Sequence, residues 1–401
     1  MRRFALSAVL SGLISTAATA ETDVSTMIAT DGLAATENHL AGLAAPTGTE
    51  LFALGGVRFL GGIETALQLR WRVGLTDGMW SMLGLPLLRL PIPENPAPLP
   101  FEAHMIEAMF AEAVADMEGA LAALDQIEDG AEVGLRLALS DIWFDINANG
   151  ARDAGEGMAD VAGLMLTGGF AEPPAMPTVR FDTADAAWLS AYAHLLAGIS
   201  ETVLAIGPTD PIQRVMETAQ GYLEVAGPPV PSTAFGIENY ATELDVIAMV
   251  IFALEQQPDA DRARAAKLHF LSMVADNRVF WTRVAQETDN DAEWIPNKTQ
   301  VSALGLPVPP ETGPRWLAVL NDAEKVLNGE LLVPYWRLGP GAGLNIGAMF
   351  DDPPPLDPIG MIQGETFLHF AEVGPLANMR ALRDFEALVG GDAPLFMVFL
   401  N

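Results

Sequence analysis

Residues 101–127 read FEAHMIEAMFAEAVADMEGALAALDQI, and the fold class is clearest in this segment. Its apolar side chains recur at the i, i+3, i+4, i+7 spacing that places them on one face of an α-helix. Met105, Met109 and Phe110 begin this face, and Met117 continues it. The spacing predicts a helix over these residues with one buried side.

The same spacing recurs on both sides of this segment. Further helices are predicted over 23–43, 50–73, 183–206, 237–254, 260–286, 314–331 and 376–388. Asp182 or Thr183 can cap the helix over 183–206, and Asp259 can cap the one over 260–286, because their side-chain oxygens accept from free N–H groups of a first turn. Residues 132–144 alternate instead, which favours an extended segment. The expected fold is mainly α, with helix far outweighing strand.

Proline and glycine divide the chain, and their density changes along it. Alanine and leucine dominate before Ala226, whereas prolines and glycines, which end helices, are frequent after about Asp289. The expected organisation is a signal peptide over 1–20, a helical region over 21–226 and a second helical region with Pro/Gly-rich loops over 237–401. Two packed helical domains and one large helical domain with a loop-rich C-terminal third both agree with this pattern.

The N-terminal residues have the pattern of a secretory signal. Two arginines precede an apolar stretch over 4–14, and an A-x-A cleavage sequence follows at 18–20. The longest later apolar run, 246–254, is shorter than the roughly 20 residues that a membrane span requires. We therefore expect a periplasmic or secreted protein with no integral membrane segment after cleavage.

Composition and charge exclude several kinds of chemistry. The chain of 401 residues contains no cysteine, so disulfides and thiol chemistry are excluded. Its formal net charge is −31, and the acidic residues are spread along the chain. Such a charge repels nucleic acid and anionic lipid, and it attracts divalent cations. No nucleic-acid partner is expected.

One segment carries a metal-ligand pattern. Residues 145–156 read DINANGARDAGE, with oxygen-bearing side chains at alternate positions and Gly150 where a sharp turn is needed. Calcium prefers six to eight oxygen ligands, which carboxylates, amides and backbone carbonyls supply. The pattern resembles the twelve-residue calcium loop of the EF-hand family. The resemblance implies Ca²⁺ as the cofactor, bound by Asp145, Asn147, Asn149, the carbonyl of Ala151, Asp153 and a bidentate Glu156.

The loop departs from paired EF-hands in two respects. Arg152 stands where an aliphatic residue usually pairs with a sister loop, and no second matching loop occurs in the sequence. The alternation before the loop, through Leu137 and Leu139, favours an extended entry over a helical one. The loop is therefore more similar to the solitary calcium loops of secreted bacterial proteins, including dockerin-like ones. A metal-free turn held by side-chain to backbone hydrogen bonds is the competing interpretation.

The sequence contains no catalytic motif that would assign an activity. G-x-S-x-G is absent, and the five histidines show no chelating spacing, so a zinc site would need distant residues. Asp182, Asp185, Glu365 and His369 could act as acid–base groups only if the fold brings them together. The sequence favours an exported calcium-binding protein with a structural or binding role. The alternatives are an exported hydrolase of glycan or peptide that calcium stabilises, and a helical scaffold for a partner in the envelope.

Overall fold

The computed structural model describes residues 23–76, 88, 90–128, 130–166, 176–227, 240–305, 308–389 and 400. The predicted signal peptide over 1–20 lies outside these residues. Within them the chain is mainly α-helical, as predicted, and its strands are short and antiparallel.

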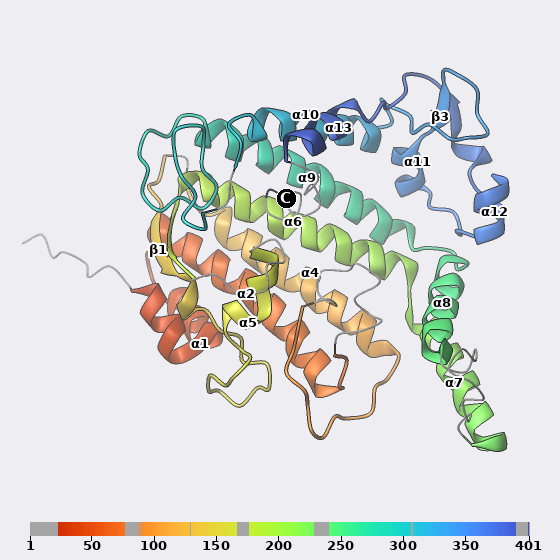
Figure 1. The fold of residues 1–401 in the computed structure, drawn as a ribbon, viewed down its shortest axis with the longest axis horizontal. Coiled ribbons are helices and arrows are strands. Elements are labelled where there is room, and N and C mark those ends of the chain that lie inside the picture. The colour runs from red at the N-terminus through yellow and green to blue at the C-terminus, as the bar shows by residue number, and fades with distance from the viewer. Residues whose placement is uncertain are drawn as a thin grey trace, which may run out of the picture.

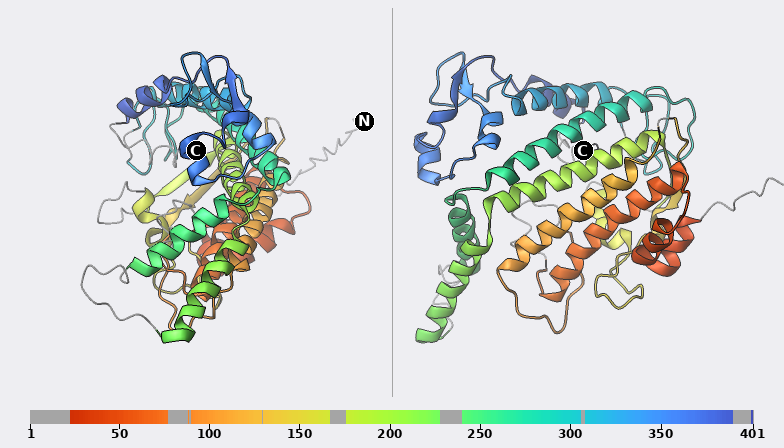
Figure 2. Two further views of the ribbon diagram at one scale, coloured as in Figure 1. Left: turned by 90° about the vertical axis from the view of Figure 1, so that its right-hand side faces the viewer. Right: turned by 180° about the vertical axis from the view of Figure 1, so that it is seen from behind.

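In the described part of the chain, four long helices lie side by side and form the centre of the molecule (Figure 1). They are α2 (Gly48–Arg72), α4 (His104–Leu124), α6 (Thr183–Ile206) and α9 (Ala260–Val284). α4 packs between α2 and α6, and α6 packs between α4 and α9, as Figure 2 shows from behind. α1 (Val24–Ala41) packs against α2 on one side, and α10 (Thr312–Leu327) with α13 (Arg380–Leu388) covers α9 on the other.

Short polar residues begin two of the central helices, α6 and α9, where the sequence predicts. Asp182 accepts the N–H of Ala184 at 2.7 Å, and Asp185 accepts the N–H of Asp182 at 2.8 Å, so two N–H groups at the start of α6 are satisfied reciprocally. Asp259 accepts the first free N–H groups of α9. Asp182 and Asp259 are thus confirmed as caps, and each contributes about 0.5–2 kcal/mol to stability.

Small residues allow α6 and α9 to approach closely. A Cβ atom at Gly198 of α6 would lie 2.7 Å from the ring of Phe270 on α9, so this contact requires glycine. Alanines without exposed surface line the helices nearby, namely Ala191, Ala193, Ala197 and Ala266. The surrounding core contains residues from α1 through α13, so helices on both sides of residues 226–237 share it.

A two-stranded sheet leads into the predicted calcium loop. β1 (Gly134–Ala138) pairs antiparallel with β2 (Thr178–Asp182), which runs directly into α6. β1 confirms the extended segment predicted over 132–144 as far as Ala138, whereas the prediction is wrong at Leu139, where a 3₁₀ helix begins. The short 3₁₀ helix η2 (Leu139–Asp141) lies between β1 and the loop, and α5 (Met158–Leu166) follows it.

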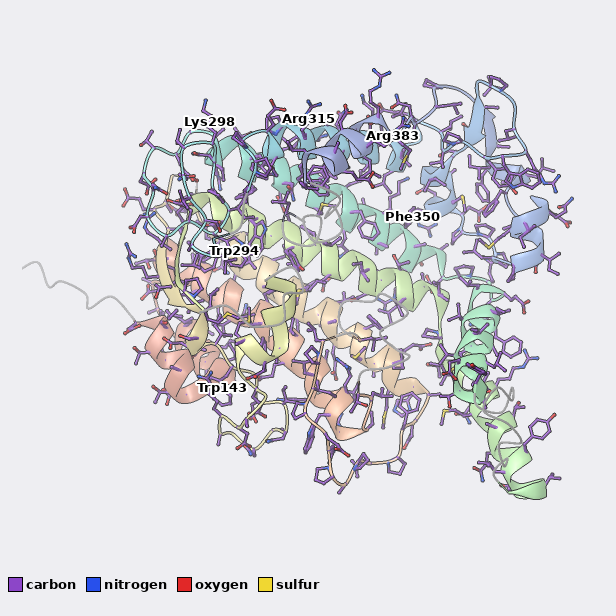
Figure 3. All side chains as sticks on the ribbon, in the orientation of Figure 1. Trp143, Trp294, Lys298, Arg315, Phe350 and Arg383 are labelled. Atoms are coloured by element: carbon purple, nitrogen blue, oxygen red, sulfur yellow. The ribbon has the colours of Figure 1, made fainter. Side chains whose placement is uncertain are left out.

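A small lobe follows α10 and lies near the start of α9 (Figure 1). Its elements are β3 (Ala342–Leu344), α11 (Ile346–Asp351), α12 (Pro358–Gln363), η4 (Leu368–Phe370) and β4 (Ala371–Val373), with β3 antiparallel to β4. α11 packs on α9, where the ring centroids of Phe270 and Phe350 are 6.2 Å apart. Phe350, labelled in Figure 3, marks the point where the lobe contacts the helical row.

Two helices form an arm at the end of the row where α6 ends and α9 begins (Figure 1). α7 (Thr209–Ala226) and α8 (Ala241–Leu254) pack against each other. α8 corresponds to a predicted helix, whereas α7 does not. Pro211 obscures α7 in the sequence, but it lies in the first turn, where a missing N–H breaks no helical hydrogen bond.

Among the helices of the described residues, α6 alone has the length and the apolar composition that a membrane span requires. In its most apolar window, 50% of the residues are buried. α4 and α9 flank it. A central position in a helical layer gives a helix the same composition, because most of its surface is then covered by protein.

Candidate metal centre

An antiparallel bridge closes the base of the loop over 145–156. Trp143 pairs with Gly157, and the N–H of Phe144 donates to the carbonyl oxygen of Glu156 at 2.8 Å. The indole N–H of Trp143 donates to the carbonyl oxygen of Ile28 at 2.7 Å, and Figure 3 shows Trp143 beside α1. The two ends of the loop are therefore held together and attached to α1.

Asp145 organises the first half of the loop. Its Oδ1 accepts the N–H of Asn149 and its Oδ2 accepts the N–H of Gly150, each at 2.9 Å. Gly150 has φ +76° and Ala148 has φ +57°, in the left-handed region that glycine adopts readily and alanine rarely. The chain thus turns sharply at the glycine, as the sequence pattern predicts.

Glu156, at the other end of the loop, has no exposed surface. Its Oε1 accepts the N–H groups of Ile146 at 3.0 Å and Asn147 at 3.3 Å, and its Oε2 accepts that of Asp153 at 2.7 Å. Three N–H donors thus supply hydrogen bonds to this buried carboxylate. A carboxylate has about four lone-pair sites, so the group keeps the capacity to bind a cation.

The remaining side chains of the pattern converge on Asp153. Its Oδ2 accepts the side-chain amide N–H groups of Asn147 at 2.8 Å and Asn149 at 2.7 Å. These two hydrogen bonds hold the pKa of Asp153 below its usual value. Ala151 is attached to the same turn, since its N–H donates to Oδ1 of Asn149 at 2.8 Å.

α2 supplies a fourth acidic group that the sequence pattern does not contain. Oε2 of Glu64 accepts the N–H of Asp145 at 2.7 Å, and the amide of Gln68 donates to the carbonyl oxygen of Asp145 at 2.8 Å. Burial raises the pKa of Glu64 to about 7, and the charges of Asp145 and Glu156 add to this effect. An acid among the apolar residues of the helix predicted over 50–73 is the signal that could have identified Glu64.

A second acidic group lies outside the loop. In the described part of the chain, three carboxylates lie so close together that one oxygen of each falls within 4.8 Å of the other two. Its members are Asp182 at the start of α6, Glu287 just after α9, and Glu293. The three carboxylates of the loop do not come this close together. The sequence does not reveal this set, because its members come from two regions more than one hundred residues apart.

Raised pKa values and hydrogen-bond donors both reduce the repulsion among the carboxylates of the second acidic group. Burial raises the pKa of Glu287 to about 7, with the charge of Asp182 adding to it, and burial also raises the pKa of Glu293. Oε2 of Glu287 accepts from Gln300 at 3.1 Å, and Oε1 of Glu293 accepts the N–H of Asp291 at 2.7 Å. The arrangement can hold a cation or exchange a proton.

The structure does not assemble the four acid–base groups considered from the sequence. Asp182 and Asp185 meet at the start of α6, where they form the helix cap. Glu365 and His369 belong to the lobe with α12 and η4, which lies toward the opposite end of the helical row (Figure 1). An active site that combines these four residues is therefore wrong.

No protein-family model matches the chain, and neither a curated protein nor a solved structure matches it.

Proposed function

We propose that the protein is an exported calcium-binding protein in which the ion orders residues 145–156. One observation supports the proposal: Asp145 and Glu156, the first and last ligands of the pattern, both turn inward onto N–H groups of the loop. A metal-free turn would share these hydrogen bonds, and the dependence of stability on calcium distinguishes the two. The loop thus has a bend and side-chain directions that agree with its resemblance to solitary EF-hand-like loops. A divalent cation would offset the charge that Asp145, Asp153 and Glu156 concentrate there.

The attachments of the loop favour a structural role for the ion. The base of the loop is bonded to α1 through Trp143, and its first ligand is bonded to α2 through Glu64 and Gln68. Ordering the loop would therefore order the connection between β1 and α5. Extracellular modules bind calcium with Kd values of roughly 0.1–1 mM, which suits the predicted export of this chain.

Thermal melting of the mature chain in EDTA and in millimolar calcium tests the proposal. At free calcium about ten times the Kd, binding contributes about 1.4 kcal/mol, which corresponds to a rise in Tm of about 2–4 °C. We expect the Glu156→Gln variant to lose this calcium-dependent rise, because it removes a charge from the bidentate ligand. Asp153→Asn, at an exposed position, should reduce it.

Glu386→Gln is the matched control, since it makes the same chemical change at an exposed position of α13. This variant should keep the full calcium-dependent rise. The comparison uses the rise rather than the absolute Tm, so a general loss of stability in Glu156→Gln does not affect it. An equal rise in Glu156→Gln and wild type, or no calcium uptake in titration calorimetry, would contradict the proposal.

A hydrolytic function is the second candidate, and a cleft away from the loop favours it. Asp182 and Glu287 line a cleft of about 730 Å³ together with Arg180 and Arg283. The raised pKa of Glu287 suits a general acid. One carboxylate oxygen of Asp182 and one of Glu287 lie within 4.8 Å of each other, so both groups could reach the same substrate. If the cleft is an active site, Glu287→Gln should abolish hydrolysis in a screen of glycan and peptide substrates.

A further inference from the structure

Two histidines that are far apart in the sequence meet between the central helices. Nδ1 of His194 on α6 lies 2.9 Å from Nδ1 of His269 on α9. The two ring centroids are 5.1 Å apart, and the ring planes are inclined by 49°. Both side chains are half-buried, and that of His194 is 20% exposed. The proposed calcium loop uses neither residue.

The close packing of α6 on α9 positions this pair. Gly198 lies one helical turn after His194, and Phe270 directly follows His269. The ring of Phe270 fits against Gly198 in a space that a Cβ atom would fill. The glycine therefore sets the distance between the helices at the point where the two imidazoles face each other.

We infer that His194 and His269 bind a divalent transition-metal ion of the zinc class between their Nδ1 atoms. Imidazole nitrogens bind zinc at about 2.0–2.1 Å, so two of them on one ion with bond angles of about 90–110° stand about 2.9–3.4 Å apart. The observed separation of 2.9 Å falls in this range. In the pair as it stands, one Nδ1–H donates to the other Nδ1 at this distance. Binding of one ion to both atoms requires the donating ring to carry its proton on Nε2 instead, while the spacing of the two helices stays the same.

Asp276 lies beside His194, where its carboxylate could fix the orientation of that ring. Its Oδ2 lies 3.8 Å from Nε2 of His194, the ring nitrogen that does not face His269, and this distance must shorten to about 3 Å for a hydrogen bond to form. Metal-binding histidines usually donate their second N–H to a carboxylate, which fixes the tautomer and makes the ligating nitrogen more basic. Asp276 lies about two helical turns after His269 on α9, so the same helix supplies a ligand and its support.

Negative charge near the pair favours a bound cation. The charges of Glu118 and Glu201 act on His269, where they oppose the lowering of its pKa by burial. Nη1 of Arg262 already donates to both oxygens of Glu201, at 2.9 and 3.1 Å. The attraction for a cation beside His269 therefore comes mainly from Glu118.

The ligand type separates this site from the calcium loop. Calcium selects oxygen ligands, whereas imidazole nitrogens select zinc, copper and nickel. Two histidines leave coordination positions open for water or for an external ligand. The histidine pair and residues 145–156 should therefore load independently.

Titration calorimetry with zinc chloride, in millimolar calcium that occupies oxygen sites, tests the inference on the mature chain. We expect one zinc site whose affinity falls at least about tenfold in His194→Gln and in His269→Gln. Asp276→Asn should weaken binding about tenfold while leaving the number of sites unchanged. His104→Gln, an exposed histidine at the start of α4, is the matched control and should bind zinc as the wild type does.

Copper in place of zinc gives a measurement that needs no variant. The electron paramagnetic resonance spectrum of the wild-type protein with one equivalent of Cu²⁺ should show hyperfine coupling to two nitrogen atoms. This result stands even if the histidine variants fold poorly. Zinc affinity unchanged in both variants, or a copper spectrum with oxygen ligands alone, would overturn the inference.

Discussion

Asp145 and Glu156 illustrate how the chain accommodates carboxylates at the level of single residues. Each directs its oxygens at backbone N–H groups of its own loop, and Glu156 does so without exposed surface. Glu287 differs, because its main charged neighbours are other carboxylates. The raised pKa of Glu287 thus follows from its burial and its acidic neighbours and not from its residue type.

The raised pKa of Glu287 predicts a pH dependence of stability. The pKa of an exposed glutamate is 4.5, whereas that of Glu287 in the folded protein is about 7, so the folded state favours the protonated form. The contribution of Glu287 to the free energy of unfolding is therefore fully present below about pH 4.5, where the group is protonated in both states. It is lost as the pH rises through about 7, where the buried group must ionise.

Glu287→Gln removes this penalty and should stabilise the protein at pH 8 by about 1 kcal/mol, after allowance for solvent screening. Urea unfolding of wild type and variant at pH 4 and pH 8 measures the difference. The gain should be absent at pH 4, where the wild-type group is largely protonated in both states. A gain that is the same at both pH values would show that the charge of Glu287 is not its cause.

At the scale of elements, the contact of α6 with α9 is the most consequential one. It positions the two histidines, and it depends on a glycine that helix propensity disfavours. The helical period in the sequence identifies both helices but contains no information on which faces meet. A small residue on an otherwise apolar helix face is the only local sign of the close approach.

Gly198→Ala should destabilise the protein by about 1–2 kcal/mol. The new Cβ atom would lie 2.7 Å from the Phe270 ring, and the free-energy cost of this overlap exceeds the gain from the higher helix propensity of alanine. Thermal or urea unfolding measures the change. Phe270→Leu in the same chain should recover part of the loss, which a double-mutant cycle detects.

Gly61→Ala in α2 is the control for this substitution, since a Cβ atom there meets no other atom within 4 Å. It should stabilise the protein by up to about 1 kcal/mol. If both glycine substitutions changed stability equally, the close contact of α6 with α9 would not be the reason for Gly198.

At the scale of the whole molecule, charge is the dominant feature. The chain has 52 acidic residues against 21 lysines and arginines, so most carboxylates have no cationic partner available. Repulsion among them opposes the compact state. The same field gives any cation-binding group in the protein a favourable long-range contribution.

Salt should therefore stabilise this protein even when no divalent cation is present. Raising sodium chloride from about 10 mM to about 300 mM shortens the Debye length from about 30 Å to less than about 10 Å and screens the repulsion. In EDTA, we expect Tm to rise by several degrees over this range. A Tm that falls would mean that the surface ion pairs, such as that of Arg278 with Glu324, outweigh the net repulsion.

Features that depend on near neighbours in the chain were determined by the sequence. The helical period predicted the central helices, the caps Asp182 and Asp259 lie next to the helices they begin, and the alternation through Leu137 predicted the strand before the loop. α7 was missed because a proline in its first turn resembles a helix break.

Features that depend on distant parts of the chain were decided by the tertiary structure alone. Glu64 reaches Asp145 across 81 residues, and His194 reaches His269 across 75 residues. A local pattern reports short-range backbone preferences and which side of an element is apolar. The partner of a side chain depends instead on which helix faces pack together, which is set by the shape of the whole core.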